Sequence, residues 1–278
     1  MFKKLLAVVT SLFIMCTSVI LNVSGDNSMP ISIYVNEREI CTDSSAYIEN
    51  GTTYVPVRAI CNAMGVTDIE WDGSQRKATI KGYSKFEFYL GKSYAYVNGE
   101  KKTMPVKAVL KNGRTMVPVR FFAENSDAQV EWDNTLHAVK ISKDGVYVPS
   151  KYCANDYSAD DVLWLSRIVH AESEGEPLKG QIAVANVVLN RVKDNDYPDT
   201  IYGVIFDRNY GVQFQPIANG TIYNKPSRNS VSAAKRALNG ENYIGNCLYF
   251  LNERIATNKW IVSNRKYYTT INNHSFYL

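Results

Sequence analysis

The hydrophobic and polar positions divide the chain into two unlike halves. In residues 30–142, short apolar runs are separated by turn signals, among them the Asn-Gly pairs at 50–51 and 112–113, each followed by alternating apolar residues. Asn-Gly before such an alternation is a strong hairpin signal, because both turn residues must tolerate positive φ. From residue 158 the apolar residues instead recur at helical spacing. The pattern predicts an α+β protein: a β-rich first half and a mainly helical second half.

The first half contains the same unit twice, at about residues 30–82 and 92–142. Tyr-Val-Asn at 34–36 returns at 96–98, Val-Pro-Val-Arg at 55–58 returns at 117–120, and Glu-Trp-Asp at 70–72 returns at 131–133. Each unit is expected to form a hairpin, a short apolar helix and two further strands. A two-fold repeat is too short for a solenoid, so we expect one domain over residues 26–145. Trp71 and Trp132 are expected to lie in its core.

The second half is predicted to begin with a capped helix. Ser158 and Asp161 have the spacing of a capping box, and Gly175 ends the apolar face that follows. Pro177 opens a second helix, apolar on nearly all sides from Ile182 to Val192, which is typical of a helix at the centre of a domain. Residues 199–206 and 230–238 suggest shorter helices, and the aromatic, Asn-rich tail from residue 247 suggests less regular structure. We therefore expect a linker at 146–157 and a domain at 158–278.

The N-terminus is predicted to direct export. A short basic start precedes an apolar run from Leu5 to Leu21, and Val23-Ser24-Gly25 offers small residues for a signal peptidase. A cleaved signal over residues 1–25 is favoured over a retained membrane anchor, and no membrane span is expected after cleavage. Four cysteines would remain (Cys41, Cys61, Cys153 and Cys247). Disulfides Cys41–Cys61 and Cys153–Cys247, or buried free thiols, are both open.

Composition and charge exclude several classes of function. The 278 residues include 21% charged and 12% aromatic residues, which is typical of a globular chain. A formal net charge of +4 is too small to indicate a nucleic-acid partner. Only three histidines are present, and His170-Ala171-Glu172 lacks the Pro-Cys-x-x-Cys of a zinc deaminase. No metal or cofactor is expected. A thiol pair of Cys247 with His274, acting as a wall peptidase, has no supporting motif.

Three glutamates cluster where the first helix of the second half ends. Glu172 is nearest the apolar face, so burial would raise its pKa as a general acid requires. Glu174 and Glu176 lie closer to the helix break, and Glu176 precedes the next helix, whose N-terminal dipole would keep it ionised. On these residues alone, a solvated acidic cluster at a helix end is the favoured interpretation.

The repeat resembles the copper amine oxidase N-terminal-like domain, found as a paired stalk module on exported bacterial proteins. The resemblance covers about residues 30–142 and lies in the Val-Pro-Val-Arg and Glu-Trp-Asp elements. It implies attachment or spacing, with wall or envelope attachment as the expected use. Copper is not implied, because the only imidazole of this region is His137, expected to be an ordinary strand side chain.

The second half resembles the catalytic domain of SleB-type cell wall hydrolases, the spore cortex-lytic enzyme family. The resemblance lies in Val-His-Ala-Glu-Ser-Glu-Gly-Glu-Pro at 169–177, Gly-Gln-Ile-Ala-Val-Ala-Asn-Val-Val-Leu-Asn-Arg-Val at 180–192, Tyr-Pro-Asp-Thr-Ile at 197–201, Gln-Phe at 213–214 and Thr-Ile-Asn-Asn-His-Ser-Phe-Tyr at 270–277. His170-Ala171 departs from the Asn-Gly that is more usual there. Asn272-Asn273-His274 stands where Gly-Asn-His is commoner.

This second resemblance implies cleavage of the β-1,4 glycosidic bond of peptidoglycan glycan strands on a lysozyme-like, mainly helical fold. Glu172 matches the catalytic acid of the family, and Glu174 and Glu176 are candidates for a second carboxylate. Gln213, Phe214, Tyr249, Trp260 and His274 are candidates to line the substrate cleft. A lytic transglycosylase, with one glutamate as acid and then base, is favoured over a hydrolytic muramidase or glucosaminidase and over an inactive wall-binding protein. The implied location is secreted and associated with the cell wall or spore envelope.

Overall fold

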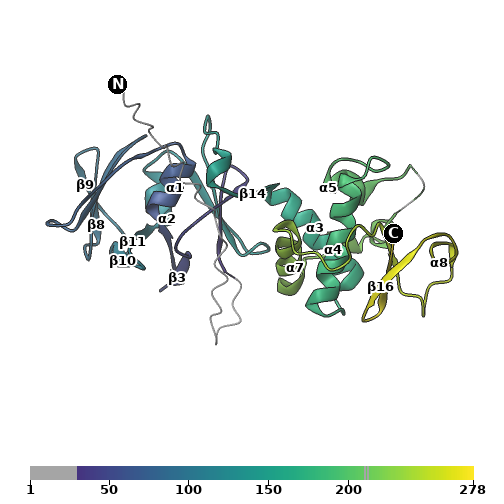
Figure 1. Cartoon of the computed structure of the whole chain (residues 1–278). Helices are drawn as coiled ribbons and strands as arrows, with labels where there is room; N and C mark the ends of the chain where they lie inside the picture. The colour runs from purple at the N-terminus through teal and green to yellow at the C-terminus, as the bar shows by residue number, and fades with distance from the viewer. Residues whose placement is uncertain (1–29, 210, 212) are drawn as a thin grey trace, which may run out of the picture.

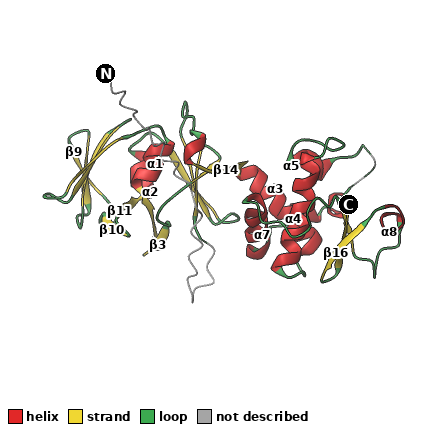
Figure 2. Ribbon diagram, in the orientation of Figure 1, coloured by secondary structure: helices red, strands yellow, loops and turns green. Residues whose placement is uncertain are grey.

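The protein consists of two lobes joined by a strand, as a computed structural model of the chain shows (Figure 1). The structure describes residues 30–209, 211 and 213–278. The predicted signal segment 1–25 lies outside the described residues. Figure 2 shows that strands dominate the first lobe and helices the second. The coarse α+β prediction, with a β-rich half before a helical half, is therefore confirmed.

The first lobe is built from three sheets and two short helices. Their strand orders are β12-β13-β1-β2-β14, β10-β11-β4-β3 and β5-β6-β7-β8-β9. All pairings are antiparallel except that of β1 with β13. The elements are β1 (Ser32–Val35), β2 (Arg38–Ile40), β3 (Tyr47–Glu49), β4 (Thr52–Pro56), α1 (Val57–Ala63), β5 (Asp68–Asp72), β6 (Lys77–Lys81), β7 (Lys85–Tyr89), β8 (Tyr94–Val97), β9 (Glu100–Thr103), β10 (Val109–Lys111), β11 (Arg114–Pro118), α2 (Val119–Glu124), β12 (Gln129–Asp133), β13 (Ala138–Ser142) and β14 (Cys153–Ser158).

The matching sequence segments occupy matching elements. The orders β4-α1-β5-β6 and β11-α2-β12-β13 repeat one another, and β4 pairs with β11 so that Val55 lies opposite Val117. Both Asn-Gly pairs form hairpin turns with positive φ, 50° and 71° at residues 50–51 and 50° and 73° at residues 112–113. The two Val-Pro-Val-Arg segments thus lie side by side in the centre of the lobe.

The prediction that the repeated tryptophans lie in the core is wrong. Trp71 is 46% exposed and Trp132 is 37% exposed. Each stands on a strand at the edge of its sheet, β5 or β12, so no further strand covers one side of the ring. His137 has a φ of 52°, which places it in the turn before β13 rather than in a strand, and its ring meets Trp132 edge-on at 5.1 Å.

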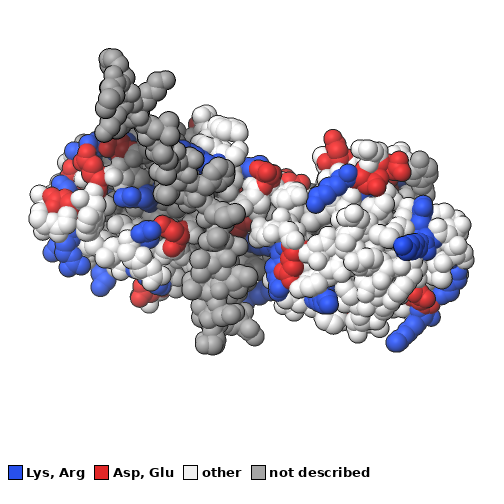
Figure 3. All heavy atoms as spheres, viewed as in Figure 1, with Lys and Arg blue, Asp and Glu red and all other residues white. Residues whose placement is uncertain are grey.

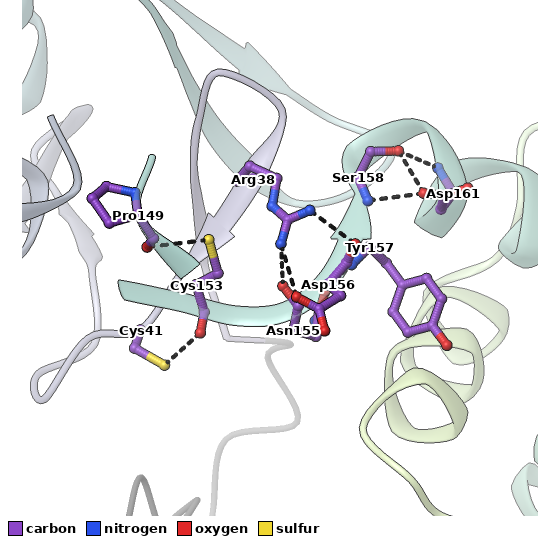
Figure 4. Close-up of polar contacts among 9 residues, drawn as sticks. All are labelled: Arg38, Cys41, Pro149, Cys153, Asn155, Asp156, Tyr157, Ser158 and Asp161. Carbon is purple, nitrogen blue, oxygen red and sulfur yellow. Dashed lines mark hydrogen bonds and ion pairs between the residues drawn. The ribbon is translucent and has the colours of Figure 1, made fainter. Parts of the chain in front are cut away.

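The segment 146–157, expected to be a linker, is largely structured. It contains a 3-10 turn (Ser150–Tyr152) and most of β14, which pairs with β2 as an edge strand. Figure 4 shows the Arg38 guanidinium donating to the carbonyl oxygens of Asn155 (3.0 Å) and Asp156 (2.9 Å). Strand pairing gives hydrogen-bond partners to backbone N–H and C=O groups that a free linker would expose to water. The connection between the lobes is therefore part of a sheet.

The second lobe has three packed helices, α3, α4 and α7, with a small sheet at its far end (Figure 1). The sheet, of order β15-β17-β16, forms in the tail where less regular structure was expected. The elements are α3 (Ala159–Ser173), α4 (Leu178–Lys193), α5 (Ile201–Phe206), α6 (Gln215–Asn219), a 3-10 turn (Thr221–Tyr223), α7 (Arg228–Leu238), β15 (Tyr249–Leu251), α8 (Trp260–Asn264), β16 (Tyr267–Ile271) and β17 (His274–Tyr277).

The helix signals of the sequence are realised in α3 and α4. Ser158 and Asp161 form the capping box, with Asp161 N–H donating to Ser158 Oγ at 3.1 Å and Ser158 N–H to Asp161 Oδ2 at 2.9 Å (Figure 4). The apolar helix α4 is buried along nearly its whole length, from Gly180 to Arg191. No helix of the described residues is long and apolar enough to cross a bilayer.

The two lobes share a packed interface. Tyr34, Leu136 and Ala138 of the first lobe are at most 1% exposed and pack in one cluster with residues of α3 and α7. Lys235 of α7 reaches across and donates to Ser32 Oγ at 2.7 Å. Figure 3 shows charges of both signs interspersed on the visible face, with a wide neutral area on the helical lobe.

The disulfides left open by the sequence are not formed. Cys61 and Cys247 are buried thiols, and each proposed pairing required one of them. Burial raises the pKa of Cys61 to about 12 and that of Cys247 to about 11, so both thiols stay protonated and unreactive. The Cys41 Sγ donates to the carbonyl oxygen of Cys153 at 3.4 Å (Figure 4).

Candidate active site

Glu172 lies on the last turn of α3, where the helix meets the loop to α4. Ser173, the last residue of α3, is buried and donates from Oγ to the carbonyl oxygen of Val169 at 2.6 Å. The Gln181 side chain of α4 donates to the carbonyl oxygens of Glu174 (3.3 Å) and Glu176 (3.0 Å). These bonds satisfy carbonyl groups that a helix end and its loop leave without partners. The loop that carries the three glutamates is thereby fixed against α4.

Glu172 is a partly buried carboxyl group with a strongly altered pKa. Burial raises the pKa of Glu172 to about 7, and the nearby positive charge of Arg191 offsets part of that rise. Removal from water disfavours the charged form of an acid. At neutral pH the group therefore exists in both its protonated and its ionised form, as a residue that gives and takes protons near pH 7 requires.

Glu176 has the opposite environment. Its carboxylate accepts hydrogen bonds from Asn272 Nδ2 (3.0 Å), Asn273 Nδ2 (2.9 Å) and the Asn273 backbone N–H (3.3 Å). Burial would raise the pKa, but these bonds, first those of Asn273, outweigh it and hold the pKa of Glu176 below its usual range. Gly180 leaves the space, since a Cβ there would lie 3.1 Å from Glu176 Cβ. Glu176 is thus an ionised anchor for the β16–β17 turn.

Glu174 is the most solvated of the three glutamates. Its side chain is 63% exposed, and its Oε2 lies 3.7 Å from His170 Nε2 one turn earlier on the helix. His170 Nδ1 accepts the backbone N–H of Ser227 at 3.4 Å, which leaves Nε2 to face Glu174. An exposed pair of this kind contributes little to stability. The interpretation of the three glutamates as a solvated acidic cluster therefore holds for Glu174 and not for Glu172 or Glu176.

A cleft of about 1700 Å³ opens beside these residues. Its walls come from the end of α3, the segment before and within α6, and the stretch from Leu248 through α8. It is lined by every site residue that the sequence singled out: Glu172, Glu174, Glu176, Gln213, Phe214, Tyr249, Trp260 and His274. Aromatic rings beside polar groups suit a carbohydrate chain, whose sugar faces are apolar and whose edges are hydroxyl groups.

The five candidate binding residues differ in what they can offer. Phe214 is 2% exposed, so it is chiefly a core side chain whose ring edge reaches the cleft, whereas Trp260 is 49% exposed. The Gln213 side chain makes one long hydrogen bond, from Nε2 to the Gly211 carbonyl oxygen at 3.3 Å. Tyr249 packs beneath the Arg265 guanidinium, 4.5 Å from its ring centre. His274 is 9% exposed, and burial lowers its pKa. Trp260 and Gln213 are therefore the most available to a ligand.

Two other acids of the second lobe do not line the cleft. Asp199 is exposed and Asp207 is buried, and neither lines it. Asp207 Oδ1 accepts the backbone N–H of Asn209 at 2.9 Å. Among the described residues, no group of three or more His, Cys, Asp and Glu side chains is placed to hold a metal ion.

Sequence reasoning missed the importance of Arg191 and of the Asn272-Asn273 turn. Arg191, at the end of α4, is 6% exposed and lines the cleft. The available signal was a cation within the apolar stretch from Ile182 to Val192, where charged residues are rarely buried. Asn272 has a φ of 52° in the β16–β17 turn. That geometry brings both amides to Glu176, and no spacing rule linked two segments so far apart in the chain.

Comparison with known families divides the chain as the two lobes do. Residues 34–141 match the copper amine oxidase N-terminal domain family. Residues 175–277 match the cell wall hydrolase family. Each match covers less than half of the chain.

Among individual proteins, the chain is similar to a spore cortex-lytic enzyme of Bacillus cereus, 43% identical over 107 residues, which is 38% of this chain and 40% of that protein. It is 32% identical over 85 residues to the cell wall hydrolase CwlJ of Bacillus subtilis, covering 29% of this chain and 58% of that protein. This chain thus spans about 40% of the spore cortex-lytic enzyme that it matches.

The chain is also similar in sequence to a protein of solved structure. The catalytic domain of the germination-specific lytic transglycosylase SleB from Bacillus anthracis is 40% identical, with 45% of this chain and 98% of that domain covered and a TM-score of 0.41. Both resemblances stated from the sequence are confirmed by these matches: the second lobe is similar to the spore cortex-lytic enzymes and matches the cell wall hydrolase family, and the first lobe matches the copper amine oxidase N-terminal domain family.

Proposed function

We propose that the second lobe cleaves the β-1,4 glycosidic bond between N-acetylmuramic acid and N-acetylglucosamine in peptidoglycan, with Glu172 as the proton donor. The supporting observation is the carboxyl group of Glu172, whose pKa is raised to about 7 by burial at the wall of a large cleft. Relatives of this lobe are named spore cortex-lytic enzymes. That relationship and the aromatic and polar residues that line the cleft support this choice of substrate.

The reaction is proposed to be lytic rather than hydrolytic. Glu172 donates its proton to the glycosidic oxygen, the bond from the muramic C1 to that oxygen breaks, and N-acetylglucosamine leaves with a new 4-hydroxyl. The Glu172 carboxylate then takes the proton of the muramic 6-hydroxyl, whose oxygen bonds to C1 and gives a 1,6-anhydro sugar. One carboxyl group suffices for both proton transfers.

The state of the other two glutamates supports this choice. A hydrolase needs a second carboxylate that is free to activate water or attack the sugar. Both oxygens of Glu176 are occupied by Asn272 and Asn273, so that residue is not a free base. Glu174 faces solvent beside His170. A lysozyme-like placement of the acid at the end of a buried helix, beside an open groove, is part of the same proposal.

The first lobe is proposed to attach or space the enzyme at the wall or spore envelope. In support, it is packed directly against the helical lobe through Tyr34, Leu136 and Lys235, so attachment of one lobe would hold the other. Its match to the copper amine oxidase N-terminal domain family, the resemblance from which a stalk role is expected, fits this proposal. The enzyme is accordingly proposed to act outside the cytoplasm, on spore cortex or vegetative wall.

Mass spectrometry of the digestion products tests the proposal. Purified peptidoglycan sacculi and decoated spores are incubated with the full chain and with Glu172→Gln. Anhydro-muramic ends from the wild type, absent with the variant, are the expected result. Reducing muramic or glucosamine ends would instead show a hydrolytic reaction. If the wild type releases no new glycan ends, the protein only binds the wall, and released amino groups would indicate a peptidase.

A further inference from the structure

A buried arginine stands behind the cleft at the end of α4. The Arg191 side chain is 6% exposed, and its Nε donates to the carbonyl oxygen of Leu248 at 2.8 Å. The guanidinium also lies over three aromatic rings, with its carbon 5.0 Å from the centre of Tyr197, 5.2 Å from Phe214 and 5.7 Å from Tyr249. Rings and a carbonyl group favour a cation without neutralising it. The position of the charge is therefore fixed.

The charge of Arg191 is not paired. Within the described part of the chain, no carboxylate oxygen lies within 4.0 Å of the guanidinium, and Nη1 is buried without a hydrogen-bond partner. A guanidinium stays protonated even where burial lowers its pKa, as it does here. Burial of an unpaired charge costs folding free energy unless a nearby group of opposite charge offsets it. The field of Arg191 must act on its neighbours at longer range.

The ionisable groups that act electrostatically on Arg191 come from four segments: Glu172 of α3, Tyr197 of the loop after α4, Asp207 after α5, and Tyr249 of β15. Glu172, Tyr197 and Tyr249 line the same cleft as Arg191. Asp207 is turned to the backbone of Asn209 and does not line the cleft. Burial and the Tyr249 hydroxyl raise the pKa of Tyr197 to about 12, so that phenol stays neutral. Of the carboxyl groups that face Arg191, Glu172 alone lines the cleft.

Three other charged groups of the cleft have partners of their own. Glu176 is bound by Asn272 and Asn273, and Glu174 lies beside His170. Arg265 stacks on Tyr249 and Trp260, at 4.5 and 5.0 Å. Among the described residues, Arg191 supplies the positive charge that acts on Glu172.

We propose that Arg191 is a positioning residue that holds a fixed positive charge near Glu172 and stabilises the carboxylate formed when Glu172 gives up its proton. The inference rests on the proposed role of Glu172. Without the charge, burial would hold Glu172 protonated and hinder its return to the base form that takes the proton of the muramic 6-hydroxyl. With it, the same carboxyl group can serve as acid and then as base in one cleft.

The test measures the ionisation of Glu172 directly in the full chain. Glutamate labelled with ¹³C at the carboxyl carbon is titrated by NMR, and the Glu172 signal is assigned by its loss in Glu172→Gln. Two neutral variants, Arg191→Gln and Arg191→Met, remove the charge; the first keeps a donor for Leu248 and the second keeps packing against the rings. Either one that folds suffices. Arg265→Met removes an arginine from the same cleft and is the matched control.

Loss of the Arg191 charge should raise the pKa of Glu172 by about one unit, the low end of the shift that a neighbouring opposite charge produces. The alkaline limb of the pH–rate profile should move upward with it, while kcat falls about tenfold or more. Arg191→Lys should return the pKa at least halfway to the wild-type value, and Arg265→Met should not move it. An unmoved Glu172 pKa in a folded neutral variant, with only thermal stability reduced, would make Arg191 structural and overturn the inference. An active Glu172→Gln would instead overturn the proposed function.

Discussion

The end of α3 and the loop before α4 hold two carboxyl groups four positions apart in opposite states. Glu172 lines the cleft, its carboxyl accepts no hydrogen bond from the described residues, and burial raises its pKa to about 7. Glu176 is also buried, yet three N–H donors hold its pKa below the usual range. Burial alone therefore does not decide ionisation. The presence of donors decides whether a buried glutamate is a proton carrier or a fixed anion.

The comparison also explains why the acid lies at the junction of two helices. The loop is tied by Gln181 and by the Asn272-Asn273 turn, so Glu176 brings the small C-terminal sheet against the end of α3. That sheet supplies a wall of the cleft beside Glu172. The ionised Glu176 therefore holds in place the wall of the cleft beside the proposed acid, Glu172.

The largest expected effect is the loss of cleavage in Glu172→Gln. A general acid contributes about 10²–10⁴-fold to a rate, and the amide cannot supply the proton. Release of muropeptides from sacculi, followed by chromatography, should fall by about 10³-fold, with the far-UV circular dichroism unchanged. Glu176→Gln, compared at a temperature where it is folded, should lose about tenfold at most. Equal losses in both variants would break the distinction between acid and anchor.

The pH dependence should expose the same group. The acid form of Glu172 is active in the first step, so kcat/KM should fall as pH rises through about 7. Each unit above that should cost about tenfold. Initial rates of anhydro-sugar formation between pH 5 and 9 measure this limb. A rate that does not change between pH 6 and 9 would show that the pKa of Glu172 is not near 7.

Stability at pH 8 should change in opposite directions in the two glutamine variants. Glu172 has a folded pKa above its unfolded value, so its ionisation opposes folding increasingly from about pH 4.5 to 7, and Glu172→Gln should gain up to about 3 kcal/mol. Glu176 has a folded pKa below its unfolded value, so it stabilises the fold above about pH 4.5 and loses this effect in acid. Glu176→Gln turns an amide donor toward two asparagines and should lose about 2 kcal/mol.

Urea unfolding at pH 5 and pH 8 checks both signs. At pH 5 the folded wild type keeps Glu172 protonated and only the unfolded chain ionises it, so the gain of Glu172→Gln should shrink to about 1 kcal/mol or less there. A gain that is the same at both pH values would come from packing rather than from ionisation. Asn273→Ala should reproduce part of the loss of Glu176→Gln, because it removes the Nδ2 donor to Glu176 and leaves the backbone N–H of residue 273 in place.

The smallest effect is expected for Glu174→Gln. Its side chain is exposed and its contact with His170 is long, at 3.7 Å, so the free energy of unfolding should change by less than about 0.5 kcal/mol. The rate of cleavage should stay within about twofold. A loss of 100-fold or more would identify Glu174 as a second reacting carboxylate and favour a hydrolytic mechanism with water.

Local signals predicted the fold where they act over a few residues. The Asn-Gly turns, the Ser158–Asp161 capping box and the apolar helix α4 depend on neighbours in the chain. The exposure of Trp71 and the pairing of β14 with β2 depend on which strand ends at a sheet edge. Periodicity within a segment carries no information on that order.

The candidate site was predictable in its members but not in their states. A helix end with three glutamates pointed to Glu172, and all eight candidate residues line one cleft. Which glutamate is free and which is bound depends on Asn272 and Asn273, about a hundred residues later in the chain. Arg191 is likewise defined by rings from three separate segments. Long-range contacts of this kind require the folded chain.

Because β14 is hydrogen-bonded into the first lobe and continues directly into the capped start of α3, the chain crosses between lobes without slack. The cleft therefore cannot move relative to the first lobe as it could on a flexible linker. If the first lobe is attached as proposed, the cleft would be held at a fixed orientation and within one molecular length of the attachment point. The spacing of attached molecules, rather than diffusion of the enzyme, would then set the spacing of cuts along a wall.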